Sequence, residues 1–137
     1  MLLTSALTCL ALNIYNEARG EPIVGQHAVA QVTMNRAKRD PKSVCKAVLE
    51  KGQFSWVDVA VDKSGGIAVV RKGSEPKDAK AWGVAKQIAN DTLNGWVTDF
   101  THGAMFYHSK RVAPAWTKAR GVKMVAAIGS HRFYRVT

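Results

Sequence analysis

The chain has 137 residues, of which 47% are hydrophobic and 22% are charged; this balance excludes a disordered chain and suits one globular domain over residues 1–137. Twenty lysines and arginines against 10 acidic residues give a formal charge of +10, which predicts a polyanionic partner such as nucleic acid, an anionic membrane or the bacterial envelope. No stretch is apolar for long enough to cross a bilayer, so we expect no transmembrane segment.

The first predicted element is a helix whose apolar face leads to a glutamate. Apolar residues recur at alternating steps of four and three: Leu3, Leu7, Leu10 and Ile14. One further step of three reaches Glu17, and Gly20 and Pro22 predict the end of the helix. A carboxyl group at the edge of an apolar wall is partly desolvated, which raises its pKa and suits a general acid. The alternative is an ion pair of Glu17 with Arg19 or Arg36.

The first 12 residues are apolar, but they carry no basic residue in front and no small-x-small cleavage site. We therefore expect them to be part of the folded domain and not a signal peptide. Without a signal peptide, Cys9 and Cys45 are expected to be free, buried thiols of a cytoplasmic protein. A disulfide between them is the alternative if the protein ends up outside the membrane.

Two further helices are predicted before Gly52. The second covers about residues 24–39, and its apolar face is formed by Val24, Ala28, Val32 and Ala37. The Asp40-Pro41 pair then predicts the N-cap and first turn of a short third helix that includes residues 44–49. Gly52 predicts its end.

The segment from residue 57 to residue 71 alternates apolar and polar residues. Val57, Val59 and Val61 fall at every second position, which predicts a strand, and residues 63–66 predict a turn before a return strand over residues 67–71. An ordered surface loop is the alternative for this segment.

The last third of the chain changes from helix to sheet. Residues 78–93 predict a long helix, and strands are expected near residues 104–108, 122–128 and 132–136. A tight turn at Gly129-Ser130 joins the last two strands. Helices followed by a small antiparallel sheet predict an α+β fold.

The carboxylates offer one candidate acid without a clear partner. Glycosidic bond cleavage usually needs a carboxylic acid and, in a hydrolase, commonly a second carboxylate. Glu17 suits the first role, and the candidates for the second are Glu21, Asp58 and Asp62. Glu21 shares a face with Glu17 only if the helix continues through Gly20, which we do not expect. Asp58 and Asp62 lie in the segment whose structure is left open.

The histidines and cysteines give no strong pattern for a metal or a nucleophile. His102, His108 and His131 match no metal-ligand spacing, so we expect them to be hydrogen-bonding core or groove residues, and we expect no metal and no cofactor. No G-x-S-x-G motif is present, and neither cysteine has a histidine neighbour in sequence.

Aromatic residues gather in the segments outside the predicted helices, among polar neighbours. Sugar rings have apolar faces ringed by hydroxyls, and such aromatic platforms suit them, although core packing explains about half of these residues equally well. The residues are Phe54, Trp56, Phe106, Tyr107, Trp116, Phe133 and Tyr134.

Several short motifs follow one another over nearly the whole chain: Asn16–Pro22, Gly25–Gln26, Ala28–Val32, Asn35–Arg36, Val44–Cys45, Gln53–Trp56, Tyr107–His108, Pro114–Trp116 and Ile128–Tyr134. In this order they resemble the SleB/CwlJ-type cell wall hydrolases. Residues 57–71 carry no firm pattern of that family. Because so many motifs occur in sequence, the resemblance is far more specific than any one of them.

The resemblance implies a lysozyme-like domain that cleaves peptidoglycan between N-acetylmuramic acid and N-acetylglucosamine, with Glu17 as the catalytic acid. Family members resemble lytic transglycosylases, in which one glutamate protonates the leaving oxygen and then takes a proton from the C6 hydroxyl of muramic acid. This closes a 1,6-anhydro ring, and tethering of the hydroxyl replaces a second carboxylate. Hydrolysis by water, as in a muramidase, stays open if Asp58 or Asp62 faces Glu17.

We expect the substrate to contact a set of residues drawn from these motifs: Glu21, Gln53, Phe54, Ser55, Trp56, Tyr107, His108, Trp116 and Tyr134. Arg19 and Glu21 could each bind sugar or the peptide stem, or lock the turn after the helix by ion pairing, and for Arg19 we favour the structural role. For Glu21 a structural role and a binding role are both open.

The combined expectation is a monomeric phage endolysin that binds peptidoglycan and is held to anionic envelope polymers by its charge. It would be made in the host cytoplasm without a signal peptide and reach the wall, in the periplasm, through a holin lesion. One rival is a non-enzymatic protein that disrupts membranes with a cationic stretch near residues 112–123, which Pro114 interrupts. A nucleic-acid-binding domain is the other, but no RNP-like, helix-turn-helix or zinc-finger pattern supports specific nucleic acid binding.

Overall fold

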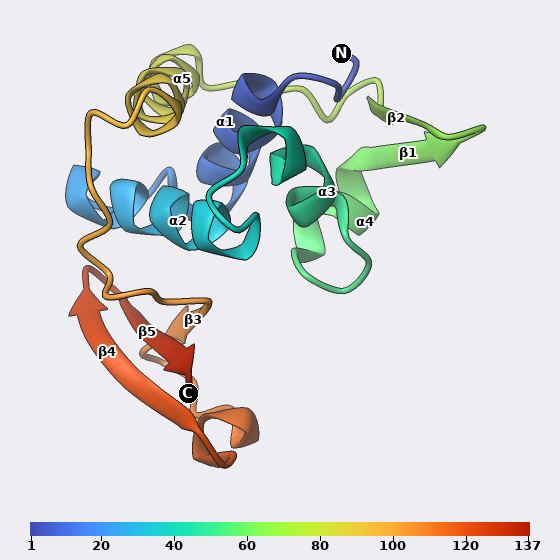
Figure 1. Cartoon of the computed structure of the whole chain (residues 1–137). Helices are drawn as coiled ribbons and strands as arrows, with labels where there is room; N and C mark the ends of the chain where they lie inside the picture. Colours follow the sequence, from blue (N-terminus) through green and yellow to red (C-terminus); the bar gives the residue numbers. More distant parts are fainter.

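Helices packed around α1 form the larger part of the molecule (Figure 1). The computed structural model describes every residue from Met1 to Thr137. The helices that pack together are α1 (Ala6–Ala18), α2 (Ile23–Arg36), α3 (Val44–Leu49) and α5 (Ala79–Leu93), and a 3-10 turn, η1 (Pro41–Ser43), leads into α3. The predicted long helix over residues 78–93 is confirmed, with Asp78 as its N-cap.

The first helix starts later than its apolar pattern suggests. Ser5 caps α1 by accepting a hydrogen bond from the Thr8 amide at 3.1 Å, so Leu3 lies before the helix, although it is buried. Leu10 and Ile14 are fully buried as predicted, whereas Leu7 is 39% exposed. The expected apolar face is therefore correct only in its second half, which is the half that leads to Glu17.

The second helix ends three residues earlier than predicted. It ends at Arg36, and Lys38 and Arg39 adopt positive φ angles of 55° and 59°, which a continuing helix does not allow. Val24 was expected on its apolar face but is 51% exposed, because the first turn of α2 lies at the surface. Asp40 caps the next turn by accepting a hydrogen bond from the Lys42 amide at 3.0 Å, as predicted.

A short helix, α4 (Ser55–Ala60), replaces most of the strand predicted from residue 57. Val57 is buried and Val59 is 73% exposed, so the valines that alternate in sequence do not share a face. The strand prediction is wrong here because Trp56, Val57 and Ala60 follow the spacing of a helix that packs on the core. The hairpin itself is confirmed: β1 (Val61–Ser64) pairs antiparallel with β2 (Ile67–Val70).

A three-stranded antiparallel sheet ends the chain and packs on α2. Its order is β3-β5-β4, formed by β3 (Phe106–Ser109), β4 (Val122–Ile128) and β5 (His131–Val136), and a 3-10 turn, η2 (Ala115–Lys118), precedes β4. Phe133 packs with Ala28 and Val32 of α2 in a small core of its own. The predicted α+β fold is confirmed, and β3 begins two residues later than expected.

The two cysteines form a disulfide between α1 and α3. Cys9 and Cys45 have their Cα atoms 5.2 Å apart, so the prediction of free thiols is wrong. That prediction relied on an assumed compartment and not on distance, and the packing of α3 against α1 brings the two residues together.

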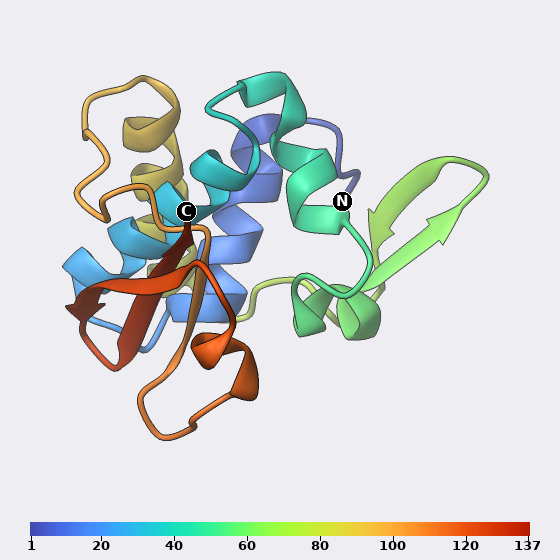
Figure 2. The same cartoon turned by 60° about the horizontal axis from the view of Figure 1, so that its bottom comes forward.

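The arrangement leaves the end of α1 between two protruding parts of the molecule. Figure 2 shows the sheet on one side of the helices and α4 with the β1-β2 hairpin on the other. None of the helices has the length and hydrophobicity that crossing a membrane requires.

Candidate active site

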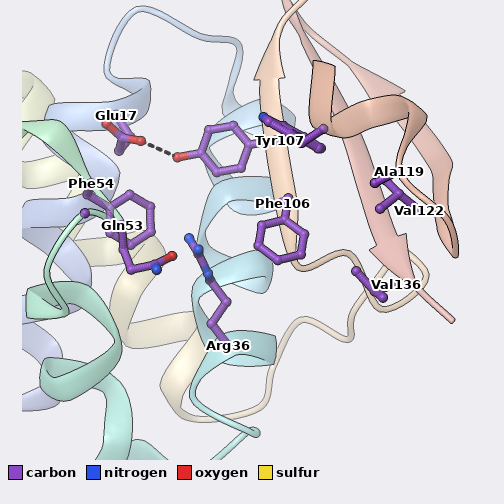
Figure 3. Close-up of a pocket in the computed structure, with 11 residues that line it drawn as sticks. Glu17, Arg36, Gln53, Phe54, Phe106, Tyr107, Ala119, Val122 and Val136 are labelled. Carbon is purple, nitrogen blue, oxygen red and sulfur yellow. Dashed lines mark hydrogen bonds between the residues drawn. The ribbon is translucent and has the colours of Figure 1, made fainter. Parts of the chain in front are cut away.

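A cavity of about 470 Å³ lies between the ends of α1 and α2, the loop before α4, and the sheet (Figure 3). The helical side contributes Glu17 and Arg36, and the loop contributes Gln53 and Phe54. Across from them, the sheet and η2 contribute apolar and aromatic side chains: Phe106, Tyr107, Trp116, Val122 and Val136. The cavity therefore has one carboxyl group, one guanidinium group and mainly apolar walls.

Glu17 is half-buried at this cavity and accepts a hydrogen bond from Tyr107. The Tyr107 hydroxyl donates to Glu17 Oε1 at 2.5 Å, and Oε2 has no hydrogen-bond partner within the chain. Burial raises the pKa of Glu17 above its ordinary value of 4.5, and this effect outweighs the hydrogen bond from Tyr107 and the charges of His131 and Arg36. The sequence predicts this partial desolvation of Glu17 and the rise in its pKa.

The ring of Tyr107 is fixed by aromatic neighbours from the next strand. It packs nearly perpendicular to the His131 ring, with the centroids 5.1 Å apart, and against Phe133 at 5.6 Å. Burial raises the pKa of Tyr107 well above 10, and the carboxylate of Glu17 adds to this effect. Tyr107 thus remains a protonated donor that orients the carboxyl group of Glu17.

Arg36 lies between two aromatic rings and forms no ion pair with Glu17. Its guanidinium carbon is 5.1 Å from the centre of the Phe54 ring and 5.2 Å from that of Phe106. Such cation–π contacts hold the charge at the cavity wall (Figure 3). From the sequence, Arg36 is expected only as an ion-pair partner of Glu17, although it lies within one of the family motifs.

Glu21 points to a different part of the molecule. It accepts hydrogen bonds from the Ser130 amide at 2.8 Å and from the Ser130 hydroxyl, and it lies 3.3 Å from His131 Nδ1. Although burial opposes the change, these bonds and the charge of His131 lower the pKa of Glu21 below 4.5. Glu21 does not line the cavity; it links the α1-α2 corner to the turn between β4 and β5.

The turn that Glu21 holds has little spare room. Gly129 has a φ of 57°, and a Cβ atom at this position would lie 2.6 Å from Glu21 Oε1. A side chain at Gly129 would therefore push against the carboxylate that joins the sheet to the helices.

The remaining predicted binding residues divide into two groups. Gln53, Phe54, Tyr107 and Trp116 line the cavity together with Glu17. Four others do not line it, because of their positions in α4 and the sheet: Ser55, Trp56, His108 and Tyr134.

The buried residues of the second group, Trp56, His108 and Tyr134, pack behind the residues that line the cavity. Trp56 donates from Nε1 to Asn13 Oδ1 at 2.8 Å in the core. His108 Nε2 lies 2.8 Å from the Tyr134 hydroxyl, and Trp116 packs edge-on against both rings, at 5.7 Å and 5.2 Å. His108 and Tyr134 therefore hold Trp116, which reaches the cavity, while Ser55 is exposed at the start of α4.

The sequence profile of cell wall hydrolases matches residues 20–134 of this chain. The chain belongs to that family. The match begins three residues after Glu17 and includes the other cavity residues except Val136. The predicted resemblance to the SleB/CwlJ-type enzymes is thereby confirmed, and so is the expectation of an enzyme of the cell wall hydrolase class.

Relatives in this family include spore cortex-lytic enzymes. Those of Bacillus cereus and Oceanobacillus iheyensis are 31% and 32% identical over 129 residues, and that of Bacillus subtilis is 32% identical over 127 residues. Each alignment covers 90% of this chain but only 42%, 39% and 35% of the respective enzyme. The chain thus spans less than half the length of these relatives.

The fold is shared with catalytic domains of known structure. The catalytic domain of the Bacillus cereus SleB protein superposes with a TM-score of 0.67 at 29% identity, covering 95% of this chain and 89% of that one. The catalytic domain of the germination-specific lytic transglycosylase SleB from Bacillus anthracis gives 0.66 at 30% identity, covering 95% and 93%. The chain thus has the fold of these catalytic domains.

For a cell wall hydrolase, the place of a second carboxylate is informative. Asp58 lies on α4 and Asp62 on β1; both are exposed, and neither lines the cavity that holds Glu17. The histidines are equally dispersed, since His102 is exposed, His108 faces Tyr134 and His131 faces Glu21. No group of three histidine, cysteine or acidic side chains in the chain lies close enough to hold a metal ion.

Proposed function

We propose that this chain is a peptidoglycan lytic transglycosylase that cleaves the bond between N-acetylmuramic acid and N-acetylglucosamine, with Glu17 as its general acid and base. The observation that carries this proposal is a single carboxyl group, with a pKa raised by burial, in a cavity walled by aromatic residues. The SleB relatives, one of which is named a germination-specific lytic transglycosylase, support the same reaction.

The first step is proton transfer to the leaving sugar. Tyr107 occupies Oε1 of Glu17, so the proton is carried on Oε2, which is free to face the substrate. This proton passes to the glycosidic oxygen, the bond from that oxygen to C1 of muramic acid breaks, and N-acetylglucosamine leaves with a free hydroxyl. Positive charge then develops at C1 of muramic acid.

The second step returns the proton to Glu17. The carboxylate takes a proton from the C6 hydroxyl of the same muramic acid, and the C6 oxygen bonds to C1 to close the 1,6-anhydro ring. No water is consumed, and the intramolecular nucleophile needs no second carboxylate for its placement. Arg36 and His131 stabilise the carboxylate between the steps, since both lower the pKa of Glu17.

Aromatic residues of the cavity suit the substrate. Phe106 and Trp116 present ring faces and edges to the same space, with their centroids 5.9 Å apart, and Gln53 adds a polar amide. Sugar rings pack on such surfaces through their C–H faces while amide groups bind their hydroxyls.

A hydrolytic muramidase is the second candidate considered, with Asp58 or Asp62 activating water. The exposed positions of these two residues outside the cavity do not favour it. Mass spectrometry of fragments released from purified peptidoglycan distinguishes the two reactions, because an anhydro product is lighter by one water molecule. We expect anhydro ends with the wild-type chain and almost no release with Glu17→Gln; reducing ends from the wild type would overturn the transglycosylase proposal.

We also propose that the chain acts as a phage endolysin that is released from the host cytoplasm through a holin-type lesion. The formal charge of +10 favours adsorption to anionic envelope polymers, and disulfides such as Cys9–Cys45 persist in oxidising compartments outside the cytoplasm. Lysis of producing cells should require co-expression of a holin. Efficient export of the chain without other phage proteins would contradict this role.

A further inference from the structure

A second cavity, of about 420 Å³, is lined in part by residues close in sequence to those of the first one. Asn16 and Trp56 line it, whereas Glu17 and Phe54 line the first cavity. Neighbouring residues of the same two segments thus face the two cavities. The rest of the second cavity is formed by α4 and by the loop between β2 and α5, which contributes residues 73–75 and Lys77.

Two cations, Arg19 and Lys77, line this second cavity, and the charge of Lys77 also acts on Glu75 in the same lining. Arg19 and Lys77 form no ion pair with any carboxylate, since the chain has a single acid–base contact of that kind, between His131 and Glu21. The Arg19 guanidinium lies 4.8 Å from the centre of the Tyr15 ring and donates to the Tyr15 carbonyl at 3.3 Å. A guanidinium has five N–H donors, so most of those of Arg19 are free for a ligand. The ion pairing expected of Arg19 is not found.

Tyr15 also holds Lys77 at the same place. Its hydroxyl accepts hydrogen bonds from the main-chain amides of Lys77 at 3.2 Å and Asp78 at 3.1 Å. One acidic residue, Glu75, lines the cavity as well, and its carboxylate accepts a hydrogen bond from the Gly73 amide at 2.8 Å. The net charge of the lining is therefore positive, and Trp56 and Val59 add an apolar wall.

We propose that this second cavity binds the carboxylate-bearing peptide stem of the muramic acid residue that lies at Glu17. The inference rests on the proposed function, because the scissile bond places a muramic acid beside Glu17. That sugar carries a short peptide on its lactyl ether, and the peptide has free carboxylates. Arg19 and Lys77 recognise these carboxylates by charge-assisted hydrogen bonds, and the apolar wall contacts the small side chains.

The test compares glycan strands that keep their peptides with strands from which an amidase has removed them. The wild-type chain should cleave intact strands with a kcat/KM about tenfold higher, as expected for charge-assisted hydrogen bonds that solvent partly screens. In the double variant Arg19→Gln/Lys77→Gln this preference should fall towards parity, mainly through KM. The control Lys42→Gln/Lys80→Gln removes the same charge from exposed residues outside both cavities and should keep the preference.

A binding measurement separates this inference from the proposed function. Calorimetric titration of the released peptide should show weaker binding, by about fivefold or more, for the Arg19/Lys77 variant and for a peptide with amidated carboxylates. Equal cleavage of the two substrates by the wild type, or a preference unchanged in the variant, would overturn the inference. Failure to cleave either substrate, with peptide binding intact, would instead overturn the transglycosylase proposal.

Discussion

The end of α1 and the corner that follows it contain two glutamates, four residues apart, in opposite environments. Glu17 faces the cavity with one hydrogen bond from Tyr107, and burial raises its pKa. Glu21 faces the β4-β5 turn, and the two hydrogen bonds from Ser130 together with His131 lower its pKa. The number of donors around a half-buried carboxyl group thus decides whether it can act as an acid or serves as a structural link.

His131 lies between the two regions. It is 3.3 Å from Glu21 through Nδ1, and its ring packs against Tyr107, the donor to Glu17. Glu21 is thereby connected to Glu17 through the side chains of His131 and Tyr107. A substitution at Glu21 therefore also tests whether Glu17 functions independently of Glu21.

The largest expected effect separates the two glutamates by rate. Glu17→Gln should lower the rate of peptidoglycan cleavage by about 10³-fold or more, because it removes the general acid. Glu21→Gln should lower the rate by only a few-fold, since Glu21 does not line the cavity. Turbidity loss of purified cell walls measures both rates, and equal losses in the two variants would contradict the distinction.

The loss of stability should be larger in Glu21→Gln than in Glu17→Gln, the reverse of the order expected for the rates. Glu21→Gln should lower the free energy of unfolding by about 2 kcal/mol, because it weakens hydrogen bonds to a charged acceptor that joins the sheet to the helices. Urea denaturation provides the value, with the exposed Glu50→Gln as a control that should change little. A larger loss in Glu17→Gln than in Glu21→Gln would count against the structural role of Glu21.

Removal of the Tyr107 hydroxyl should have a moderate effect on rate and a specific effect on pH dependence. Its hydrogen bond lowers the pKa of Glu17, so Tyr107→Phe should raise that pKa further. The alkaline limb of the kcat/KM profile should move to higher pH, while the rate at the optimum falls about tenfold through poorer orientation of the acid. An unchanged alkaline limb would show that Tyr107 does not act on Glu17.

The smallest expected effect is a pair of opposite pH dependences of stability. The pKa of Glu17 is raised in the folded state, so its contribution is present below pH 4.5 and is lost as the pH rises through the folded pKa. The pKa of Glu21 is lowered, so its contribution is present above pH 4.5 and is lost as the pH falls through the folded pKa. Denaturation across pH 3–8 should therefore show that the free energy of unfolding of Glu17→Gln rises relative to that of the wild type as the pH rises. The loss of unfolding free energy in Glu21→Gln should become smaller towards acid pH. Both changes should be on the order of tenths of a kcal/mol to 1 kcal/mol.

Local patterns in the sequence were sufficient for most helices and for the placement of Glu17. The steps from Leu10 through Ile14 predict the side of α1 that carries Glu17, the cap at Asp40 is as predicted, and the helix predicted over residues 78–93 is found as α5. The prediction for the segment around α4 is wrong because valines at every second position are typical of a strand. What decides its structure is a tertiary contact, the Trp56 side chain bonded to Asn13 in the core.

The sequence alone does not predict which of the aromatic residues face the cavity. Tyr107 and His108 are neighbours on β3, and strand alternation sends one towards Glu17 and the other towards Tyr134. Which of the two faces the cavity depends on how the sheet packs on α2. The same holds for Cys9 and Cys45, whose pairing follows from helix packing and not from their spacing.

The most direct test of the account is a titration of the glutamate carboxyl groups by ¹³C NMR, with Glu17→Gln and Glu21→Gln used for assignment. We expect the Glu17 resonance to titrate above the ordinary value of 4.5 and the Glu21 resonance below it. A Glu17 pKa at or below 4.5, or a Glu21 pKa higher than that of Glu17, would contradict the claim that burial at the cavity makes Glu17 the proton donor.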